Sequence, residues 1–200
     1  MKGVLMHLLA LACSPRKNGN TEILLDRFLE ACRDHHADIE KIWLPALNLR
    51  PCAHCDFCLQ NQTCRLDDDM KSLYPKLLET DVLVLASPIY FMAHAAQAKI
   101  FIDRCQMFWA RRYVQKNPIR PAAGPPRRAV FIAVGATHGP QVFAGAKTTM
   151  KWFLDSLRME YWDNLLIDGC DEKGAIRDHP TALDEAYRLG AKLAQSYHNP

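Results

Sequence analysis

The sequence lacks the features that assign proteins to several large classes. Its 25 basic and 22 acidic residues leave a net charge of +3, which is too small to indicate nucleic-acid binding by itself. No apolar stretch approaches the ~20 residues that a membrane-spanning helix needs. The G-x-x-x-x-G-K loop of nucleoside-triphosphate-binding proteins and the G-x-G-x-x-G motif of dinucleotide-binding proteins are both missing. We therefore expect neither a nucleic-acid partner nor a membrane segment.

The overall composition is that of a folded protein with an unusual number of cysteines. Hydrophobic residues make up 49% and charged residues 24% of the 200 positions, which excludes disorder, collagen and a coiled coil for the chain as a whole. At this length we expect a single domain, residues 1–200, with an ordinary core. In such a chain, eight cysteines with four of them clustered indicate metal binding or redox chemistry in a reducing compartment, so we expect a cytoplasmic protein.

Apolar runs alternate with amphipathic segments along the chain. Apolar runs predict strands at Val4–Ala12, Val82–Ala86 and Ala129–Val134, and two segments of mixed polarity, Ile39–Leu44 and Glu160–Ile167, are expected to be the remaining strands. The amphipathic segments predict helices at Asn20–His35, Met70–Glu79, Ala93–Trp109, Gln141–Leu157 and Thr181–Tyr197. Two stretches are expected to be irregular, a cysteine-rich loop at 47–66 and a loop rich in proline and arginine at 111–128. This alternation predicts an α/β fold with a doubly wound parallel sheet of five strands, which binds ligands beyond the carboxyl ends of its strands.

The first of these runs has a second interpretation. Val4–Ala12 is similar in length to the hydrophobic part of a secretory signal. It is interrupted by His7, however, and only one basic residue precedes it. A buried strand is therefore the favoured interpretation.

The loop after the first predicted strand, Cys13–Thr21, has the residues of an anion site. The N-terminus of the helix that follows offers free backbone N–H groups and the positive end of the helix dipole. Ser14 and Thr21 add polar side chains, and Arg16 and Lys17 add positive charge. The segment suits a phosphate monoester, although a polar turn with a helix cap needs the same residue types.

Two further loops suit a flat aromatic ligand. Ser87–Phe91 follows the third predicted strand and offers the rings of Tyr90 and Phe91, which are alternatively core or interface residues. Gly135–Gly139 follows the fourth predicted strand, and its small residues allow backbone N–H groups to approach a ligand closely. A phosphate loop, an aromatic loop and a glycine loop at one sheet edge favour flavin mononucleotide (FMN) over a dinucleotide.

Cys52, Cys55, Cys58 and Cys64 form the most specific pattern in the sequence. Two-residue gaps place three thiols on one side of a short loop, and the fourth follows in the same segment. Because zinc sites usually use two well-separated C-x-x-C pairs, this compact arrangement favours a 4Fe-4S cluster. Metal-free thiols and a zinc site are the alternatives.

With these motifs in view, the sequence resembles the flavodoxin-like NAD(P)H-dependent FMN reductase family, and within it the iron–sulfur flavoprotein branch. The resemblance rests on four segments in the family's order, which are Ser14–Thr21, the cysteine loop with Asp68–Met70, Ser87–Phe91 and Lys99–Arg104. The C-terminal motifs Glu172-Lys173-Gly174 and Leu189-Gly190 are also similar to that family. It implies a flavodoxin-like sheet of order 2-1-3-4-5, bound FMN, a homodimer or homotetramer, and electron transfer.

The resemblance also implies a set of site residues. The first loop would bind the FMN phosphate through Ser14, Arg16, Asn20 and Thr21, with Asn18 as a further cofactor-binding residue. The residues expected at the isoalloxazine ring are Pro88, Ile89, Tyr90, Phe91, Gly135 and Thr137. The cluster ligands would be Cys52, Cys55, Cys58 and Cys64.

The function predicted from these features is that of an FMN-dependent oxidoreductase. It would pass electrons between a 4Fe-4S cluster and FMN, both at the same sheet edge, toward a small-molecule acceptor. A cluster-free NAD(P)H-dependent reductase that works by hydride transfer is the alternative, and a binding protein with a structural zinc loop is a third. His94, His138 and Tyr90 are candidate proton donors, although a lone histidine is more often structural. The basic 111–128 loop could dock an acidic donor such as a ferredoxin, but a solvated connection or a subunit contact is favoured.

Overall fold

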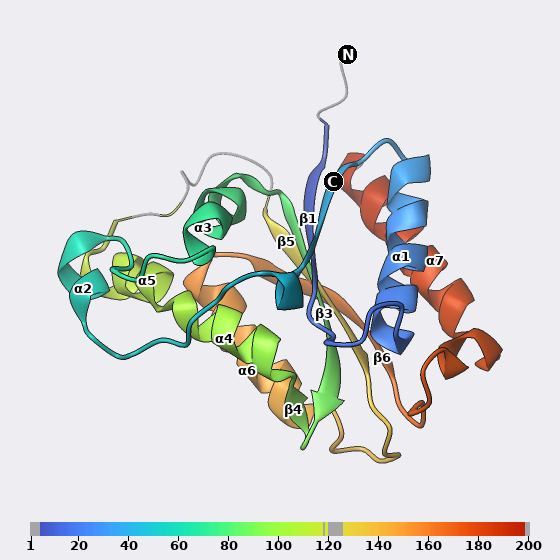
Figure 1. The fold of residues 1–200 in the computed structure, drawn as a ribbon. Helices are drawn as coiled ribbons and strands as arrows, with labels where there is room; N and C mark the ends of the chain where they lie inside the picture. The colour runs from blue at the N-terminus through green and yellow to red at the C-terminus, as the bar shows by residue number, and fades with distance from the viewer. Residues whose placement is uncertain (1–4, 118, 120–125, 199–200) are drawn as a thin grey trace.

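A twisted, mainly parallel sheet forms the centre of the computed structural model, which describes residues 5–117, 119 and 126–198 (Figure 1). The strands are β1 (His7–Ala12), β2 (Asp38–Trp43), β3 (Val82–Tyr90), β4 (Ala93–His94), β5 (Arg128–Val134) and β6 (Glu160–Ile167). Five of them pair in parallel in the order β2-β1-β3-β5-β6, and the two-residue β4 pairs antiparallel with β3. Apart from β4, this is the 2-1-3-4-5 order expected of a flavodoxin-like fold, and the predicted fold class is confirmed.

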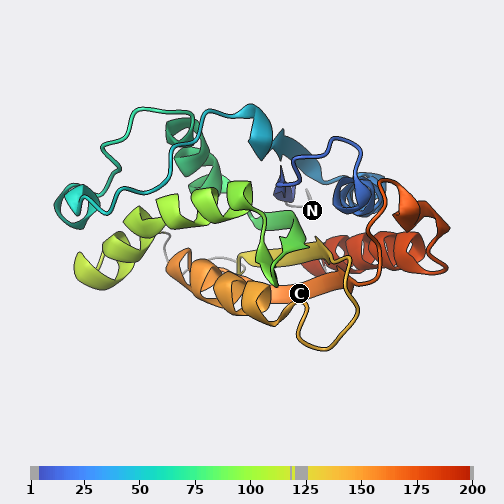
Figure 2. The ribbon, with the colours of Figure 1, turned by 60° about the horizontal axis from the view of Figure 1, so that its bottom comes forward.

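Helices cover both faces of the sheet. They are α1 (Asn20–Asp34), α2 (Phe57–Asn61), α3 (Met70–Glu79), α4 (Ala96–Arg104), α5 (Gln106–Trp109), α6 (Ala144–Ser156) and α7 (Ala182–His198). Shorter turns of helix occur at Leu44–Ala46, Ala110–Val114 and Ala175–Asp178. Figures 1 and 2 show α1 and α7 on one face of the sheet and α3, α4 and α6 on the other.

The central strands β1, β3 and β5 are largely apolar because both of their faces are buried, whereas the edge strands β2 and β6 carry polar residues and are partly exposed. Along β1, Leu9 and Leu11 pack into the core beneath α3, α4 and α6, whereas Leu8 and Ala10 pack into the core beneath α1 and α7. Side chains alternate between faces with a period of two, so a sheet covered on both sides needs a continuous apolar run. This is why the positions of the central strands could be predicted from the sequence.

Helices α1 and α7 cross very closely. A Cβ atom added at Gly190 would lie 2.3 Å from the Phe28 carbonyl oxygen, so no larger residue fits at this crossing. Cys32 lies in the same contact and donates a weak hydrogen bond from its thiol to the Gly190 carbonyl oxygen, at 3.7 Å.

The third strand continues past its predicted end. We expected Ser87 and Pro88 to stop it, but β3 runs on to Tyr90 and turns back into β4. The pairing with β1 ends at Ala86, so Pro88 lies beyond the last position where β1 needs an N–H group from β3. The predicted end of this strand was therefore wrong, and a hairpin takes its place.

Four other predicted segments differ in detail. The expected helix Ala93–Trp109 begins with β4 and is interrupted at Cys105, so that it forms α4 and α5. The expected 141–157 helix begins three residues later, as α6. The cysteine-rich 47–66 loop contains the short helix α2, and the 111–128 loop begins inside a π-helical turn. Residues 118 and 120–125 of that loop lie outside the described part of the chain.

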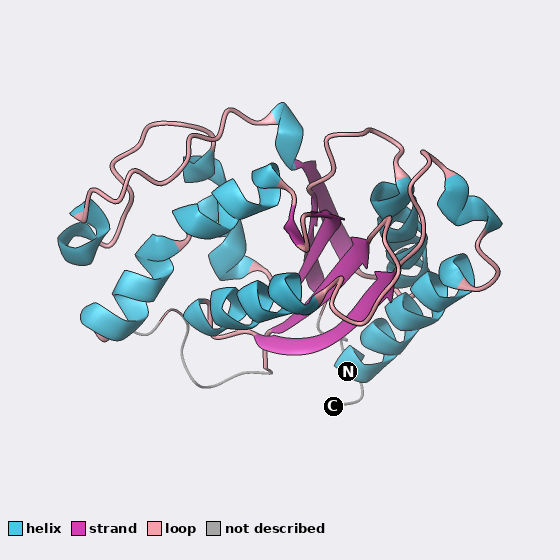
Figure 3. Ribbon diagram, turned by 90° about the horizontal axis from the view of Figure 1, so that it is seen from below, coloured by secondary structure: helices cyan, strands magenta, loops and turns pink. Residues whose placement is uncertain are grey.

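The carboxyl ends of the parallel strands meet at one edge of the molecule, onto which Figure 3 looks. The loops that follow β1, β3, β5 and β6 lie at this edge, whereas α2 and the cysteine-rich segment lie to the side, next to α5 (Figures 1 and 3). None of the helices in the described residues is long and apolar enough to cross a membrane.

Candidate functional site: a strand-end pocket and a cysteine pocket

A pocket opens at the carboxyl edge of the sheet, and we call it the strand-end pocket. Its lining residues come from four loops: Ser14, Arg16, Gly19, Asn20, Thr21, Pro88, Ile89, Tyr90, Val134, Ala136, Cys170, Asp171 and Lys173. Seven of the predicted FMN-binding residues are among them, while Asn18, Phe91, Gly135 and Thr137 are not. The structure therefore brings the first, third and fourth predicted loops together at one edge, and adds the loop after β6.

The first loop leads directly into the N-terminus of α1. The Ser14 hydroxyl accepts a hydrogen bond from the Arg16 backbone N–H at 3.2 Å, which folds the loop into a tight turn. A Cβ atom at Gly19 would lie 3.0 Å from the Arg16 carbonyl oxygen, so glycine suits this turn. No side chain caps the first turn of α1, which leaves its backbone N–H groups available to an anion.

Asn20 has a role that the sequence did not reveal. Its side-chain nitrogen donates to the Glu172 carbonyl oxygen at 2.8 Å, and its side-chain oxygen accepts the Gly174 N–H at 2.8 Å. The amide thus joins the first loop to the loop after β6 and makes one wall of the pocket rigid. Because both ends of this side chain have partners, the backbone of Asn20 is what remains for a phosphate.

The loop after β6 was not predicted to belong to the site. Cys170, Asp171 and Lys173 line the pocket from this loop, and Lys173 adds a second positive charge to that of Arg16. The Arg16 guanidinium reaches across to the Asp171 carbonyl oxygen at 3.4 Å. Burial raises the pKa of the Cys170 thiol, with a further contribution from the charge of Asp168, so this thiol is neutral near pH 7.

The β3–β4 hairpin forms the aromatic side of the pocket. Tyr90 lines the pocket and is partly exposed, whereas the adjacent Phe91 is fully exposed and points away from the lining. Phe91 and Met92 both have positive φ angles, 50° and 60°, which reverse the chain direction within two residues. The tightness of this turn decides which of the two rings faces a ligand.

The loop after β5 is tied to the loop after β6. The Gly135 N–H donates to the Ile167 carbonyl oxygen at 2.9 Å, so this amide already has a partner. His138 Nδ1 lies 3.3 Å from a carboxylate oxygen of Asp168. The His138 ring occupies the space above Gly169, where an added Cβ would lie 2.1 Å from a ring carbon.

The second candidate proton donor, His94, is structural. It is buried against Phe131, with ring centroids 5.0 Å apart, and its Nε2 lies 3.1 Å from the Ala146 carbonyl oxygen. Burial lowers the pKa of His94 to about 4, so the ring is neutral at pH 7. His94 supports the β3–β4 hairpin and does not line the strand-end pocket.

A second pocket, the cysteine pocket, contains all four clustered cysteines. Its lining includes Cys52, Cys55, Cys58, Cys64, Leu66, Arg104 and Met107, and it shares no residue with the strand-end pocket. Burial raises the pKa of the Cys58 thiol, and the other three cysteines of the pocket raise it further. The lining of this pocket includes Gln106 and Met107 of α5, and the cysteine-rich segment lies to the side of the loops at the carboxyl edge (Figure 1), so the expectation that both groups share one sheet edge is not met.

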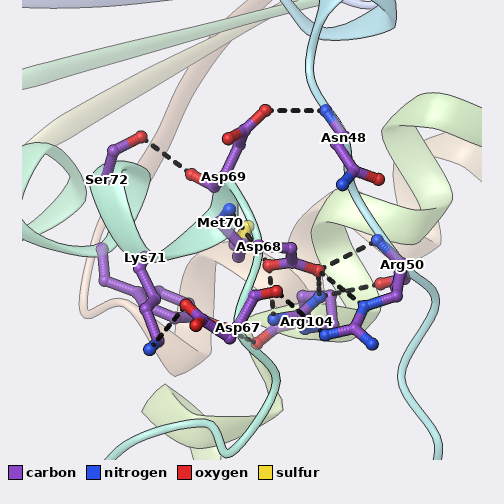
Figure 4. A network of polar contacts seen from close by, with 10 residues as sticks. Asn48, Arg50, Asp67, Asp68, Asp69, Met70, Lys71, Ser72 and Arg104 are labelled. Carbon is purple, nitrogen blue, oxygen red and sulfur yellow. Dashed lines mark hydrogen bonds and ion pairs between the residues drawn. The ribbon is translucent and has the colours of Figure 1, made fainter.

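Both ends of the cysteine-rich loop are fixed by one polar network (Figure 4). Asp68, whose side chain is completely buried, accepts hydrogen bonds from Arg104 Nη1 at 2.5 Å and Nη2 at 3.0 Å. The same carboxylate accepts the Arg50 backbone N–H at 3.0 Å, and Asp69 accepts the Asn48 N–H at 2.8 Å. The chain before Cys52 is therefore held against the chain after Cys64.

The buried ion pair is charged over the whole physiological pH range. Burial by itself would raise the pKa of Asp68, but the hydrogen bonds from Arg104 and the Arg50 N–H lower it below its ordinary value. Burial would likewise lower the pKa of Arg104, but Asp68 and the neighbouring Tyr74 and Cys64 raise it. Of the three guanidinium nitrogens, only Nε is buried without a hydrogen-bond partner.

The other side of the cysteine pocket is formed by α2 and the π-helical turn. The side chain of Gln115 donates to the carbonyl oxygens of Cys58 and Leu59 at 3.0 and 2.9 Å, which fixes the end of α2. In the described part of the chain, no three histidine, cysteine or acidic side chains are grouped closely enough to hold a single metal ion. The four thiols share a pocket without forming a finished coordination sphere.

Arg112 and Arg127, two of the arginines of the 111–128 loop that the structure describes, form contacts within the molecule. Arg127 is buried and donates to the carbonyl oxygens of Thr80 at 2.9 Å and Leu157 at 3.1 Å. Arg112 forms an ion pair with Asp155 at 3.1 Å. These contacts differ from the solvated connection that we favoured, and they leave less positive charge for docking an acidic partner.

Comparison with known proteins identifies the family. A family model described as NADPH-dependent FMN reductase matches residues 6–160. The chain belongs to this family. The matched range includes the cysteine pocket and three of the four loops of the strand-end pocket, whereas Cys170, Asp171 and Lys173 lie beyond it.

Individual relatives agree with this family. The chain is 27% identical over 117 residues to an iron-sulfur flavoprotein of Methanosarcina thermophila, which covers 58% of the chain and 61% of that protein. It is 32% identical over 106 residues to an iron-sulfur flavoprotein of Archaeoglobus fulgidus, covering 53% and 54%. The matches thus span little more than half the length of these relatives.

Solved structures agree with the fold. The NAD(P)H:quinone oxidoreductase from Methanothermobacter marburgensis superimposes with a TM-score of 0.72 at 18% identity, over 95% of this chain and 96% of that one. At this level of identity the similarity establishes the fold alone. What this FMN reductase family member does is inferred from its own two pockets.

Proposed function

We propose that this FMN reductase family member is an FMN-dependent oxidoreductase with FMN in the strand-end pocket. The observation that carries the proposal is that an uncapped helix N-terminus, two positive side chains and a tyrosine ring line one pocket. Such a pocket offers backbone N–H groups and charge to a phosphate at one end and an aromatic face to a ring system at the other. The NADPH-dependent FMN reductase model supports the same ligand.

Different residues of the pocket would bind the phosphate and the ring of FMN. The first turn of α1, with Thr21 and the charges of Arg16 and Lys173, would bind the phosphate. Pro88, Ile89 and Tyr90 would flank the ring from the hairpin side. FMN, when bound, supplies hydride and single-electron chemistry, and the protein contributes binding, orientation and exclusion of water. NAD(P)H is the proposed electron donor and a small molecule the acceptor.

We further propose that Cys52, Cys55, Cys58 and Cys64 hold a 4Fe-4S cluster. Four thiols that line one pocket are the ligand set of such a cluster, in which each thiolate binds a different iron. The buried, unpartnered Nε–H of Arg104 in the same pocket wall fits a sulfur-rich anionic group, because it offers such a group a hydrogen bond. The names of the iron-sulfur flavoproteins among the relatives are consistent with this ligand.

A second candidate is the same flavin oxidoreductase without a cluster. It is favoured by the arrangement of the cysteines, which are not grouped closely enough to hold a metal ion in the described residues. In that case the cysteine pocket would contain ordinary thiols, and NAD(P)H would reduce FMN directly. The two candidates agree on the strand-end pocket and differ only at the cysteine pocket.

We also propose that the protein is a homo-oligomer. Trp109, Tyr113 and Trp152 are large aromatic residues with exposed side chains on α5, the π-helical turn and α6. Aromatic residues at such positions are enriched at protein–protein interfaces. Size-exclusion chromatography with light scattering tests this proposal, and a monomer at micromolar concentration would contradict it.

Anaerobic purification followed by flavin and iron quantitation tests the proposed function. We expect one FMN per chain and about four irons, with a broad absorbance band near ~400 nm beneath the flavin bands. One FMN without iron, together with rapid NADPH oxidation, would favour the cluster-free candidate. A chain without flavin that cannot be reconstituted with FMN would contradict both.

A further inference from the structure

We propose that Arg104 tunes the redox group of the cysteine pocket, by donating a hydrogen bond from Nε–H to a sulfur atom of that group. This inference rests on the proposed 4Fe-4S cluster and adds to it a residue that is not a ligand. Arg104 is at the C-terminal end of α4, forty residues after Cys64, and is separate from the cysteine-rich segment in sequence.

The orientation of the Arg104 guanidinium is fixed by its other contacts. Nη1 donates to Asp68 at 2.5 Å and to the Arg50 carbonyl oxygen at 2.8 Å, and Nη2 donates to Asp68 at 3.0 Å. The guanidinium plane is rigid, so these bonds also determine where Nε–H points. The backbone of Arg104 is fixed as well, because its carbonyl oxygen accepts the Tyr74 hydroxyl at 3.1 Å.

The Nε–H of Arg104 is buried and has no hydrogen-bond partner in the described residues. A buried donor without an acceptor is destabilising, and each such group in a native structure calls for an explanation. Arg104 belongs to the wall of the cysteine pocket, and Cys64 is close enough to raise its pKa. A sulfur atom of a group held by the four cysteines is an acceptor that would satisfy this donor.

The ion pair between Asp68 and Arg104 forms a dipole whose orientation is fixed. Asp68 is bonded to the Nη edge of the guanidinium, so the Nε edge carries the positive end of a neutral pair. Leu66 and Met107 also line the pocket, and their apolar side chains keep the local dielectric low. One-electron reduction adds one negative charge to the cluster without making or breaking a bond. Arg104 therefore stabilises the reduced form, which raises the reduction potential.

Substitution by lysine separates this role from the structural role of the ion pair. Arg104→Lys keeps a positive charge that can pair with Asp68 but has no second nitrogen to replace Nε. Arg65→Gln is the matched control, because Arg65 lines the same pocket but is exposed. The double variant Asp68→Asn/Arg104→Gln replaces the buried ion pair with a neutral pair, and it serves if the lysine variant does not fold.

The experiment is an anaerobic dithionite titration of each purified protein, with the reduced cluster followed by electron paramagnetic resonance and FMN by absorbance. In Arg104→Lys we expect the ratio of reduced to oxidised cluster at a given potential to fall at least tenfold, about 59 mV for one electron. We expect less than a threefold change in Arg65→Gln, because solvent screens an exposed charge. The potential of FMN, in the other pocket, should stay the same in every variant.

Two results would overturn the inference and leave the proposed function standing. The first is Arg104→Lys with full iron content and an unchanged cluster potential. The second is a variant that binds FMN normally and loses its iron, because Arg104 would then act only in assembling the loop. A wild-type protein that takes up no iron under anaerobic reconstitution would instead contradict the proposed cluster, and the inference with it.

Discussion

The strand-end pocket and the cysteine pocket are built in different ways. Four loops at the carboxyl ends of the strands form the strand-end pocket, and the pairing of the strands in the sheet determines where these loops lie. One segment of the chain, beside the sheet, supplies most of the second, and its two ends are held together by Asp68 and Arg104. The first pocket is positioned mainly by backbone pairing and the second mainly by one buried ion pair.

This difference predicts how each pocket responds to substitution. Many residues of the paired strands hold the loops of the strand-end pocket in place, so a single substitution there should weaken ligand binding by a modest amount. The cysteine pocket concentrates its support in few groups, and the loss of one should matter more. The following predictions, from the largest expected effect to the smallest, test this contrast.

Asp68→Ala should be the most damaging single change. It leaves the Arg104 guanidinium buried and unpaired, and breaking a buried pair in this way costs about 3–5 kcal/mol. Urea denaturation monitored by circular dichroism measures the loss. Asp69→Ala is the matched control, because this neighbour accepts one backbone N–H at an exposed position, and its effect should be much smaller. Equal losses in the two variants would contradict the special role of the ion pair.

As the pH falls, the stability that depends on neutral His94, which supports the β3–β4 hairpin, should be lost before the stability that depends on ionised Asp68. The folded pKa of His94 is about 4, below its unfolded value of about 6.5, so the unfolded chain binds a proton that the folded chain excludes. Stability should therefore fall by about 1.4 kcal/mol per pH unit as the pH drops from 6.5 to 4. Asp68, with its lowered pKa, contributes stability that is lost only at still lower pH.

Denaturation curves of the wild type and of His94→Gln across this pH range check the prediction. The variant should lose most of the slope between pH 6.5 and 4, and keep the loss at lower pH that Asp68 causes. An identical slope in the two proteins would contradict the assignment to His94.

Asn20→Ala should weaken FMN binding, because it releases the loop after β6 that forms one wall of the strand-end pocket. The change removes hydrogen bonds to the partly buried backbone groups of Glu172 and Gly174, each of which contributes about 1 kcal/mol. We expect at least a tenfold weaker FMN affinity, measured by fluorescence titration. Asn20→Asp keeps the acceptor for the Gly174 N–H but adds a negative charge beside the proposed phosphate site, so it should also bind FMN more weakly than the wild type. Undiminished affinity in the alanine variant would show that the loop after β6 does not form the wall.

Tyr90→Ala should have the smallest of these effects. An aromatic stacking contact contributes about 1 kcal/mol, which corresponds to roughly fivefold in the FMN dissociation constant. Phe91→Ala is the control, since this ring is fully exposed and outside the pocket. Equal effects of the two substitutions, or none for Tyr90, would refute the stacking role.

The sequence predicted those parts of the structure that depend on local pattern. Continuous apolar runs located the central strands β1, β3 and β5, and the loops at the strand ends followed from the rule for parallel sheets. The spacing of the four cysteines correctly indicated a common pocket. Ser87–Pro88 misled because proline usually ends a strand, whereas here β1 has already ended at Ala12 and β3 continues beside β5 as far as the Pro88–Val134 pair.

Other parts depend on contacts between distant residues and could not be predicted. Asn20 had the residue type of a phosphate ligand, but its side chain binds a loop 150 residues away. Cys170 and Lys173 are ordinary loop residues, and only the motif Glu172-Lys173-Gly174 marked their segment. The network of Asp68 and Arg104 was visible only as two short motifs, and the fold shows that they form one contact.

Calorimetric titration of the flavin-free protein with FMN and with riboflavin tests the central claim most directly. The two ligands differ only in the phosphate, which the first turn of α1, Arg16 and Lys173 are proposed to bind. We predict one FMN per chain and at least tenfold weaker binding of riboflavin, since a charge-assisted hydrogen bond is worth about 1.5–3 kcal/mol. Equal affinities for the two, or no binding of FMN, would contradict the account.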